Sequence, residues 1–454
     1  MRYGCFSAIA LAAGLFCQTA SAQVATVRDA IGAQLDPRYP ALFELYKHFH
    51  ANPELSSCET KSSARVAEEF KRAGFEVTSN VGGHGVVAVL KNGSGPTVLV
   101  RADMDALPVK EQTGLPYASK VIAKDGAGND VSVMHACGHD VHMTCLIGTA
   151  QVLAQLKGRW RGTLVLIGQP AEELGGGARR MLADGLFTRF PRPDFCIALH
   201  DTASAPAGSI NYTPGFSAAN VDSVDISVRG VGGHGAHPYR TKDPVVLASQ
   251  IVLALQTIVS REIKAGEPAV VTVGSIHGGT KHNIIPDEVK LQLTVRSYSD
   301  EVRKRVLAAI PRIVRGQALA AGMPEDHMPV VHIGPEYTPA VYNDPKLTER
   351  LVGVFRSLLG EVNVVEEKPG MGGEDFGEYG RTEHKIPICM FDIGAAKRES
   401  FEESRRTGKP LPGLHSALFA PDPEPTLKTG ITATTAAVLE LMNQRGAASD
   451  YSAR

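Results

Sequence analysis

The sequence predicts an α/β protein whose mostly parallel sheet is interrupted by an inserted α+β domain. Across residues 23–214, short and fully apolar strand-like runs alternate with helix-like segments, which is typical of a parallel sheet covered on both faces. Over residues 215–336 the segment order changes to β-α-β-β-α-β, the arrangement of a ferredoxin-like module. The first pattern returns over residues 337–445, so we expect the module to be inserted into one catalytic domain.

The first part of the catalytic domain begins with two predicted helices. Apolar periodicity predicts one over residues 36–50, before Asn52-Pro53, and another over residues 61–73, which stops at Gly74. A third helix is predicted from His139 to Gln155. The expected strands are 85–90, 97–101, 162–168 and 195–200. Because open α/β sheets place their chemistry beyond the carboxyl ends of strands, polar residues that follow these strands are candidates for a site.

The later segments follow the same reasoning. In the inserted domain the expected strands are 221–228, 269–276, 288–297 and 328–333, with helices over 243–262 and 300–321. The second part of the catalytic domain has a predicted helix over 346–359, a strand over 388–393 and a polar loop over 395–412. Residues 446–454 have the composition of a frayed tail.

Composition and charge limit the classes of function. With 454 residues, 43% hydrophobic and 21% charged, the chain is large enough for two cores. A formal net charge of −1 gives no reason to expect nucleic acid or an anionic membrane as a partner. Residues 1–22 end in Ala-Ser-Ala after an apolar run too short for the ~20 residues of a membrane span, which is typical of a cleaved signal peptide. We therefore expect an exported protein, periplasmic or secreted.

Potential metal ligands lie far apart in the sequence: the glutamate pair and His200 stand at strand ends, Cys137 and His139 at the start of a predicted helix, and His415 after the polar loop. They are a thiol, imidazoles and carboxylates: Cys137, His139, Glu172, Glu173, His200 and His415. Zinc and its neighbours accept these ligand types. Two adjacent carboxylates at a strand end are costly unless a cation neutralises them. One glutamate can bind metal while the other stays free as a base, which is what metal-assisted hydrolysis requires.

Taken singly, these residues also have ordinary interpretations. Cys137 and His139 can be a buried thiol and a helix cap, and Glu172 and Glu173 a solvated pair of charges. A lone His200 is more often a core histidine, and a lone His415 a surface residue. His142, one helical turn after His139, is expected to support the site rather than bind metal. The motifs around these residues decide between the interpretations.

As a set, the motifs resemble the metal-dependent aminoacylase and glutamate-carboxypeptidase superfamily of zinc exopeptidases. The similarity is to its amidohydrolase branch of hippurate hydrolases and auxin-conjugate hydrolases, and it runs in family order from about residue 36 to 440. The matching motifs are Arg-Ala-Asp-Met-Asp-Ala-Leu-Pro from Arg101, Met-His-Ala-Cys-Gly-His-Asp from Met134, Gln-Pro-Ala-Glu-Glu from Gln169, Ala-Leu-His ending at His200, Gly-Gly-His-Gly-Ala-His-Pro from Gly232, His-Asn-Ile-Ile-Pro from His282, Gly-Gly-Glu-Asp-Phe from Gly372 and Leu-His-Ser from Leu414.

The resemblance implies a zinc-exopeptidase-like catalytic domain with two divalent metal ions, zinc or manganese, with cobalt or nickel as alternatives. The implied metal ligands are Cys137, His139, Glu173, His200 and His415, and the implied general base is Glu172. Many relatives have a histidine ligand where this chain has Asp103, but the hydrolase branch has this aspartate. Asp103 is therefore left out of the ligand set, and Asp105 is expected to support a ligand from behind.

The inserted domain is implied to contribute to the same reaction. In relatives, the residues that match His234, Asn283 and Arg296 face the substrate and its carboxylate. Arg296 stands in Leu-Thr-Val-Arg, where the branch more usually has Gly-Thr-x-Arg. Because the inserted domain pairs subunits in relatives, we expect a homodimer or higher oligomer in which the histidine can reach the neighbour's site.

The sequence thus predicts a metal-dependent amidohydrolase that cleaves N-acyl amino acids, such as hippurate-like or N-acetyl conjugates. Glu172 would move the proton of the attacking water to the leaving amine, and His234 would stabilise the oxyanion. The planar guanidinium of Arg296 would favour substrates with a carboxylate. The alternative enzyme is a di-metal exopeptidase acting on small peptides. A periplasmic binding protein, the alternative without catalysis, has no use for a base beside the ligands.

Overall fold

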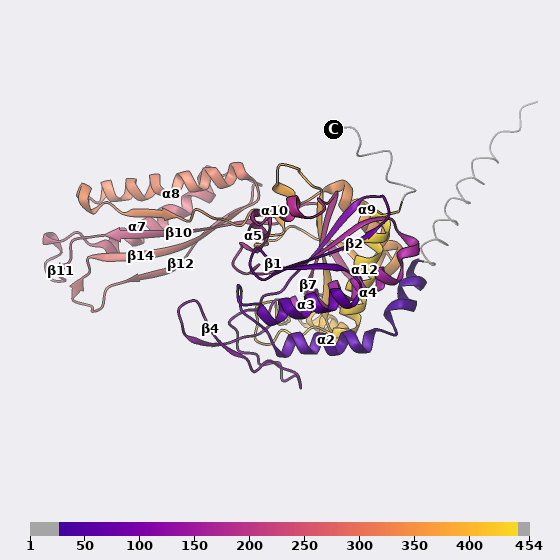
Figure 1. The fold of residues 1–454 in the computed structure, drawn as a ribbon. Helices are drawn as coiled ribbons and strands as arrows, with labels where there is room; N and C mark the ends of the chain where they lie inside the picture. Colours follow the sequence, from indigo (N-terminus) through magenta and orange to yellow (C-terminus); the bar gives the residue numbers. More distant parts are fainter. Residues whose placement is uncertain (1–26, 444–454) are drawn as a thin grey trace, which may run out of the picture. The chain divides into compact units, whose positions relative to one another are not determined.

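The structure is a computed structural model that describes residues 27–443, and these form two compact units (Figure 1). Unit 1 comprises residues 27–215, 342–368 and 378–443, and unit 2 comprises residues 216–341 and 369–377. Unit 2 therefore takes in residues 369–377, which the sequence assigned to the catalytic domain. The predicted signal peptide, residues 1–22, and the predicted tail, residues 446–454, lie outside the described residues.

Unit 1 is built on one eight-stranded sheet. Its strand order is β1 (Glu76–Val81), β2 (Gly85–Asn92), β6 (Gly162–Gln169), β3 (Thr97–Asp103), β7 (Phe195–Pro206), β18 (Ile388–Ala396), β8 (Ile210–Tyr212) and β17 (Val364–Glu366). The central pairs β6–β3, β3–β7 and β7–β18 are parallel, whereas β1 and β2 extend the sheet in antiparallel fashion. The predicted α/β fold class with a mostly parallel sheet is confirmed.

Helices cover this sheet, and the most deeply buried of them is α4. The helices are α2 (Tyr39–Ala51), α3 (Thr60–Arg72), α4 (His139–Gln155), α5 (Gly177–Ala183), α6 (Leu186–Arg189), α9 (Pro345–Leu359), α10 (Gly377–Arg381), α11 (Arg398–Thr407) and α12 (Pro423–Leu441). The side chains of α4 are buried on every face from His139 to Ala150, because α2, α3, α12 and the sheet all pack against it. The N-terminus of α4 is thereby held in the protein interior.

Residues 395–412 were predicted to form a polar loop, but the structure has helix α11 within this range. No residue of α11 is buried, so the helix lacks the apolar periodicity on which the prediction relied. Local interactions favour the helix instead. Arg406 makes an ion pair with Glu403 one turn earlier, and Gly408 ends the helix with a φ of +73°. The helix α12 and the strand β1 are further elements that the sequence did not predict.

Unit 2 has its own sheet and its own core. The sheet order is β12 (Ala269–Gly278), β14 (Glu288–Ser297), β10 (Asn220–Arg229) and β15 (Val330–Ile333), and all neighbours are antiparallel. Helices α7 (Pro244–Thr257) and α8 (Asp300–Ala320) lie on one face of it (Figure 1). Their buried Leu247, Ile251 and Val306 pack with Val224 and Leu291 of the strands. The chain order β-α-β-β-α-β is that of the predicted ferredoxin-like module.

Short strands complete the two units. They are β4 (Ile122–Lys124), β5 (Asp130–Ser132), β9 (Gly215–Ala218), β11 (Gly233–His234), β13 (Ile284–Ile285) and β16 (Val341–Asn343). Among the described residues, one stretch, Pro244–Glu262, is long and apolar enough to cross a membrane. It comprises α7 and the turn after it, and Leu247, Ile251 and Leu255 place one side of it in the core of unit 2.

Candidate metal centre

A glycine turn places the first two predicted ligands at the buried N-terminus of α4. Gly138, between Cys137 and His139, has a φ of +75°. A Cβ atom at this position would lie 2.2 Å from Oδ1 of Asp201. Only glycine fits both the left-handed backbone and the close approach of the carboxylate. The turn lets Cys137 and His139 face the same site although they are two residues apart.

The glutamate pair is held by a second tight turn, at the end of β6. Ala171 has a φ of +52°, and its N–H donates to Oε1 of the buried Glu59 at 2.8 Å. A Cβ atom at Gly177 would lie 1.7 Å from the carbonyl oxygen of Pro170, so the loop closes tightly on itself. Glu172 and Glu173 come directly after Ala171, so this turn sets the direction in which the backbone carries them away from β6.

The last two predicted ligands come from β7 and from the loop before α12. His200 lies in β7, and its Nδ1 donates to the carbonyl oxygen of Asp201 at 2.7 Å. This leaves the lone pair of Nε2 available to a metal. His415 has a φ of +64°, and its N–H donates to the carbonyl oxygen of Ala136 at 2.7 Å. The loop is thereby tied to the segment that carries Cys137.

All five predicted ligands and the predicted base meet within unit 1. The groups whose ligand atoms lie within 4.8 Å of one another include Cys137–His139–His200, Cys137–Glu173–His415 and His139–Glu172–Glu173. The sulfur of Cys137 is 3.6 Å from Nε2 of His200 and 3.2 Å from Nε2 of His415. Cys137 belongs to two of these groups, so its sulfur would be available to ions held by either of them. The ligand roles themselves stay predictions.

The buried polar atoms of this cluster fit a divalent cation. Nε2 of His139 and Oε1 of Glu173 lie 3.9 Å apart, and neither has a hydrogen-bond partner among the described residues. Burying a polar atom without a partner costs roughly 1–3 kcal/mol, more when the group is charged. One cation between the two atoms would satisfy both. The donor set of thiol, imidazole and carboxylate is also one that zinc and its neighbours accept.

Asp105 supports the site from behind. Its Oδ1 lies 3.3 Å from Nδ1 of His139, which directs Nε2 of that ring toward Glu173. Its other oxygen, Oδ2, accepts hydrogen bonds from Oγ of Ser56 at 2.6 Å and from N–H of Glu173 at 3.0 Å. Asp105 therefore contacts both halves of the ligand set, as expected of a residue that orients ligands.

A second layer of charged residues was only partly foreseen. Arg101 donates to Oδ2 of Asp103 at 2.7 Å, and Nδ1 of His142 lies 2.6 Å from the other Asp103 oxygen. Nε2 of His142 lies 3.1 Å from Oδ1 of Asp201. The spacing of His142 from His139 predicted a supporting role for His142, but Asp201 carried no signal beyond its position after His200. The imidazole of His142 thus joins two buried carboxylates.

Burial dominates the electrostatics of the cluster. It raises the pKa of the Cys137 thiol well above its usual range, raises the pKa of Glu173, and lowers the pKa of His200 to about 3. Burial alone would lower the pKa of His139, but the carboxylates of Asp103 and Asp105 outweigh it and raise that pKa. A bound cation favours thiolate and carboxylate, so it opposes the first two shifts.

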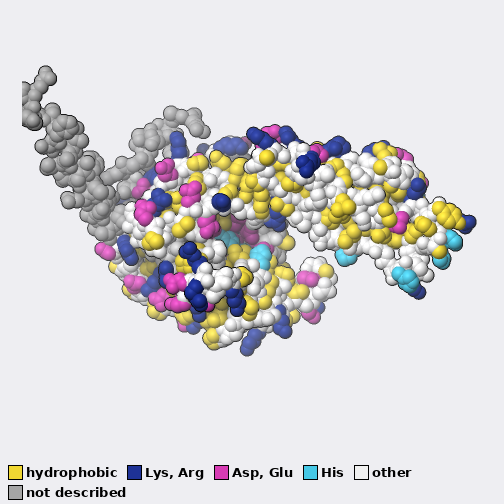
Figure 2. All heavy atoms as spheres, turned by 180° about the vertical axis from the view of Figure 1, so that it is seen from behind, with side chains coloured by type: hydrophobic (Ala, Val, Ile, Leu, Met, Phe, Trp, Pro, Cys, Tyr) yellow, Lys and Arg dark blue, Asp and Glu magenta, His cyan; other side chains and the backbone are white. Residues whose placement is uncertain are grey.

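The three predicted residues of the inserted domain lie in unit 2 and do not form one group. His234 is exposed on β11, where Figure 2 shows histidine side chains gathered at one end of the unit, and Asn283 is exposed beside it. Arg296 lies near the other end of β14, where its Nη1 donates to the carbonyl oxygen of Met371 at 2.7 Å. At about 3.3 Å per residue, Glu288 and Arg296 are about 26 Å apart along the strand.

The position of Cys137 predicts how its reactivity depends on metal. A thiolate bound to metal is shielded, so alkylation at alkaline pH should be slow in metal-loaded protein and should increase after chelation. Mass spectrometry of alkylated peptides measures this. Cys58 is exposed and should react in both states, whereas Cys145 is fully buried and should react in neither. Equal labelling of Cys137 with and without metal would remove it from the ligand set.

Known proteins resemble this chain over most of its length. It is 39% identical over 383 residues to a Bacillus subtilis protein named as an amidohydrolase, YhaA, covering 83% of this chain and 90% of that protein. It is 38% identical over 341 residues to the hippurate hydrolase of Campylobacter jejuni, covering 74% and 84%. The crystal structure of Bacillus subtilis YxeP, a dinuclear metal-binding peptidase of the M20 family, superposes with a TM-score of 0.72 at 28% identity, covering 90% and 99%.

These relatives correct one prediction. We expected an exported protein, periplasmic or secreted, because residues 1–22 have the pattern of a cleaved leader. The amidohydrolase and the hippurate hydrolase, which the chain matches over most of their length, contradict that expectation, and the prediction is wrong. It rested on the composition of one short stretch, whereas the similarity extends over several hundred residues.

The same findings confirm the predicted class of enzyme, a metal-dependent hydrolase of amides. The candidate ligand groups and the dinuclear relative together support two divalent metal ions. Residues 99–404, about two thirds of the sequence, match the family described as Peptidase family M20/M25/M40. The chain belongs to this M20/M25/M40 peptidase family.

Proposed function

We propose that this protein hydrolyses the amide bond of N-acyl amino acids at a centre of two divalent ions, zinc or manganese. The observation that carries the proposal is the pair of ligand groups that share Cys137, with Glu172 beside them. The substrate class is supported by the names of the relatives, an amidohydrolase and a hippurate hydrolase. The thiolate favours zinc over harder ions, and elemental analysis of purified protein would identify the metal.

Cys137, His139, Glu173, His200 and His415 would hold the metal ions, which supply Lewis acidity to polarise the amide carbonyl and acidify a water. The remaining chemistry falls to the side chains of the protein. Glu172 is buried, and it shares a group with the ligands His139 and Glu173. From there it accepts a proton from the attacking water and passes it to the leaving amine. The turn at Ala171, held by its hydrogen bond to Glu59, fixes the backbone from which this carboxylate extends.

Replacing the proposed base should separate catalysis from metal binding. Glu172→Gln keeps the shape of the side chain but cannot accept the proton, so turnover of N-benzoylglycine should fall roughly 10²–10⁴-fold. Its metal content, measured by elemental analysis, should stay that of the wild type. The matched control is Glu173→Gln, which should lose metal together with activity. Turnover near the wild-type value in Glu172→Gln would show that another group is the base.

Arg296 is proposed to bind the α-carboxylate of the substrate. Its guanidinium is half-buried, and the bonds from Nη1 to Met371 and from Nε to Thr294 leave Nη2 for a further acceptor. A bidentate pair with a carboxylate would select N-acyl amino acids over neutral amides.

Arg296→Ala should therefore raise KM for an N-acyl amino acid by roughly tenfold or more. The corresponding carboxamide should be affected much less, because it lacks the charge that the arginine binds. Steady-state kinetics on the two substrates measure the difference, and Arg305→Ala, an exposed arginine on α8, is the control. If KM rises equally for the carboxylate and the carboxamide, Arg296 serves only to hold the carbonyl of Met371.

The oligomeric state belongs to the same proposal. Strand β12 is an edge of the unit 2 sheet, and Ile276 on it is 52% exposed. On α7, Val246 is 54% and Leu253 is 73% exposed. An exposed edge strand beside exposed apolar side chains favours pairing with a second copy of the same surface. We therefore expect a homodimer through unit 2.

Because His234 lies far from Arg296 within unit 2, a homodimer would supply these two residues to an active site from different subunits. Gly232, two residues before His234, donates to Asp287 just before β14, and Arg296 lies toward the far end of that strand. The strand runs about 26 Å from Glu288 to Arg296, which is more than one N-acyl amino acid can span. If both residues contact substrate, they serve different active sites, and His234 acts in the site of the neighbouring subunit. The proposal thus keeps the sequence-based expectation that the histidine reaches the neighbour's site.

Mixing two inactive variants tests this arrangement. In a hybrid of Glu172→Gln and His234→Ala subunits, one of the two sites has an intact Glu172 and receives an intact His234 from the partner. Random exchange of equal amounts should restore about a quarter of wild-type activity, because half of the dimers are hybrids with one complete site. Each variant alone, carried through the same exchange, is the control. No recovery despite verified hybrid formation would mean that His234 acts in its own subunit or not at all.

A further inference from the structure

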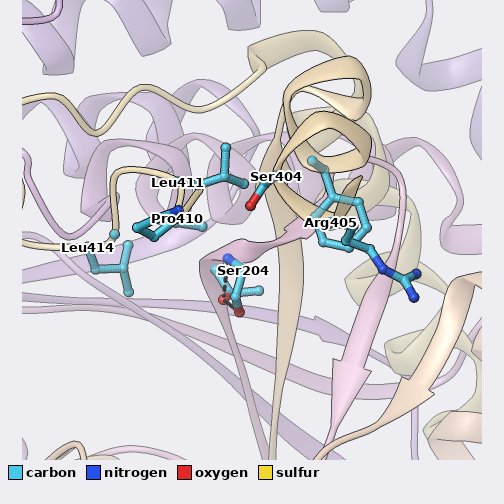
Figure 3. Close-up of a pocket in the computed structure, with 10 residues that line it drawn as sticks. Ser204, Ser404, Arg405, Pro410, Leu411 and Leu414 are labelled. Carbon is cyan, nitrogen blue, oxygen red and sulfur yellow. Dashed lines mark hydrogen bonds between the residues drawn. The ribbon is translucent and has the colours of Figure 1, made fainter. Parts of the chain in front are cut away.

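A pocket of about 570 Å³ lies in unit 1 beside the metal centre. Its walls are β7, helix α11 and the loop from Pro410 to Leu414 (Figure 3). Figure 3 shows Ser204 of the strand facing the space between Ser404 of the helix and Leu411 and Leu414 of the loop. The volume falls within the roughly 300–1,000 Å³ typical of small-molecule pockets.

Two walls of this pocket continue directly into metal ligands. In β7, residues 201, 203 and 205 are buried, so His200, Thr202 and Ser204 share the opposite, open face of the strand. Thr202 and Ser204 line the pocket, and His200 belongs to the metal centre. On the other side, Leu414 lines the pocket and the next residue is the ligand His415. The pocket and the metal centre are therefore neighbours along both segments.

The interior of the pocket is suited to an uncharged group. Phe401, Leu411 and Leu414 contribute apolar surface. The polar side chains are already engaged, because the hydroxyls of Thr202 and Ser204 bond to each other at 2.8 Å and Ser404 donates to the carbonyl of Lys409. Arg405 is the one charged residue of this lining, and its guanidinium extends away from the loop of Leu411 (Figure 3).

We infer that this pocket binds the acyl group of the substrate and selects uncharged aromatic or aliphatic acyl chains larger than acetyl. The inference rests on the proposed hydrolysis of N-acyl amino acids. The amino-acid half carries a carboxylate one carbon from the amide nitrogen and needs a cation there, whereas the guanidinium of Arg405 extends away from the apolar loop of Leu411. The acyl half carries no charge, and burying its methylene groups or its ring against apolar side chains is favourable.

Phe401→Ala tests the inference with three substrates, the N-acetyl, N-benzoyl and N-octanoyl derivatives of alanine. Removing the ring should lower kcat/KM for the benzoyl and octanoyl substrates about tenfold or more, and should change the acetyl substrate less than about twofold. Phe401 is half-buried on α11, so its loss leaves both cores intact. Glu402→Ala, the adjacent exposed position, should leave all three values unchanged. Equal losses on all three substrates would overturn the inference.

A second series distinguishes the acyl group from the amino-acid side chain. With the acyl group held as acetyl, the ratio of kcat/KM between N-acetylphenylalanine and N-acetylalanine should be the same in Phe401→Ala and wild type. A change confined to this ratio would assign the pocket to the side chain and refute the acyl assignment. If the wild-type enzyme cleaves none of these compounds, the proposed function fails, and binding decides about the pocket by itself.

Binding can be measured without turnover. The sequence has one tryptophan, Trp160, which is buried in the core of unit 1, so Phe401→Trp adds one reporter in the pocket wall. In this variant combined with Glu172→Gln, N-benzoylglycine should cause a saturable change in tryptophan emission, and N-acetylglycine should not. An emission that stays constant up to saturating N-benzoylglycine would mean that the pocket does not take the acyl group.

Discussion

Much of unit 1 depends on neutralising a buried cluster of acidic, imidazole and thiol groups around Cys137. The sulfur lies within 3.6 Å of Nε2 of His200 and within 3.2 Å of Nε2 of His415, and two further atoms, on His139 and Glu173, have no hydrogen-bond partner among the described residues. Such a cluster is unfavourable in a core unless cations balance it. The fold offsets this cost by holding each donor atom where a divalent ion could bind to it.

The rigidity comes from the backbone as much as from side chains. Gly138 leaves room for Asp201, and the turn at Ala171 is bound to the buried carboxylate of Glu59. His415, also in the left-handed region, is tied to the backbone of Ala136. Each of these positions carries some strain, roughly 1–3 kcal/mol for a residue other than glycine, which the surrounding packing offsets. These backbone positions fix where the segments that carry the proposed ligands leave the strands and the helix.

In the proposed mechanism, residues of both compact units take part in the reaction. Unit 1 holds every proposed metal ligand and the proposed base, together with the pocket that we assign to the acyl group. Unit 2 carries the proposed carboxylate-binding arginine on β14 of its four-stranded sheet and the exposed histidine on β11 of a separate two-stranded sheet. In the proposed arrangement, one copy of unit 2 does not apply both residues to the same small substrate. Dimerisation, which elsewhere often serves stability, would here complete the active site.

The sequence by itself determined the alternation of strands and helices, the ferredoxin-like order of the insert, and the candidate ligands. These follow from periodicity, glycine punctuation and motif content, which are local properties. Helix α11 was missed because it buries nothing, and Asp201 because one carboxylate after a histidine carries no signal. Only the tertiary structure could decide that Cys137 serves two ligand groups, that a pocket adjoins His200 and His415, and that His234 lies far from Arg296. Such distances depend on how separate strands and loops pack, and no stretch of sequence encodes that packing alone.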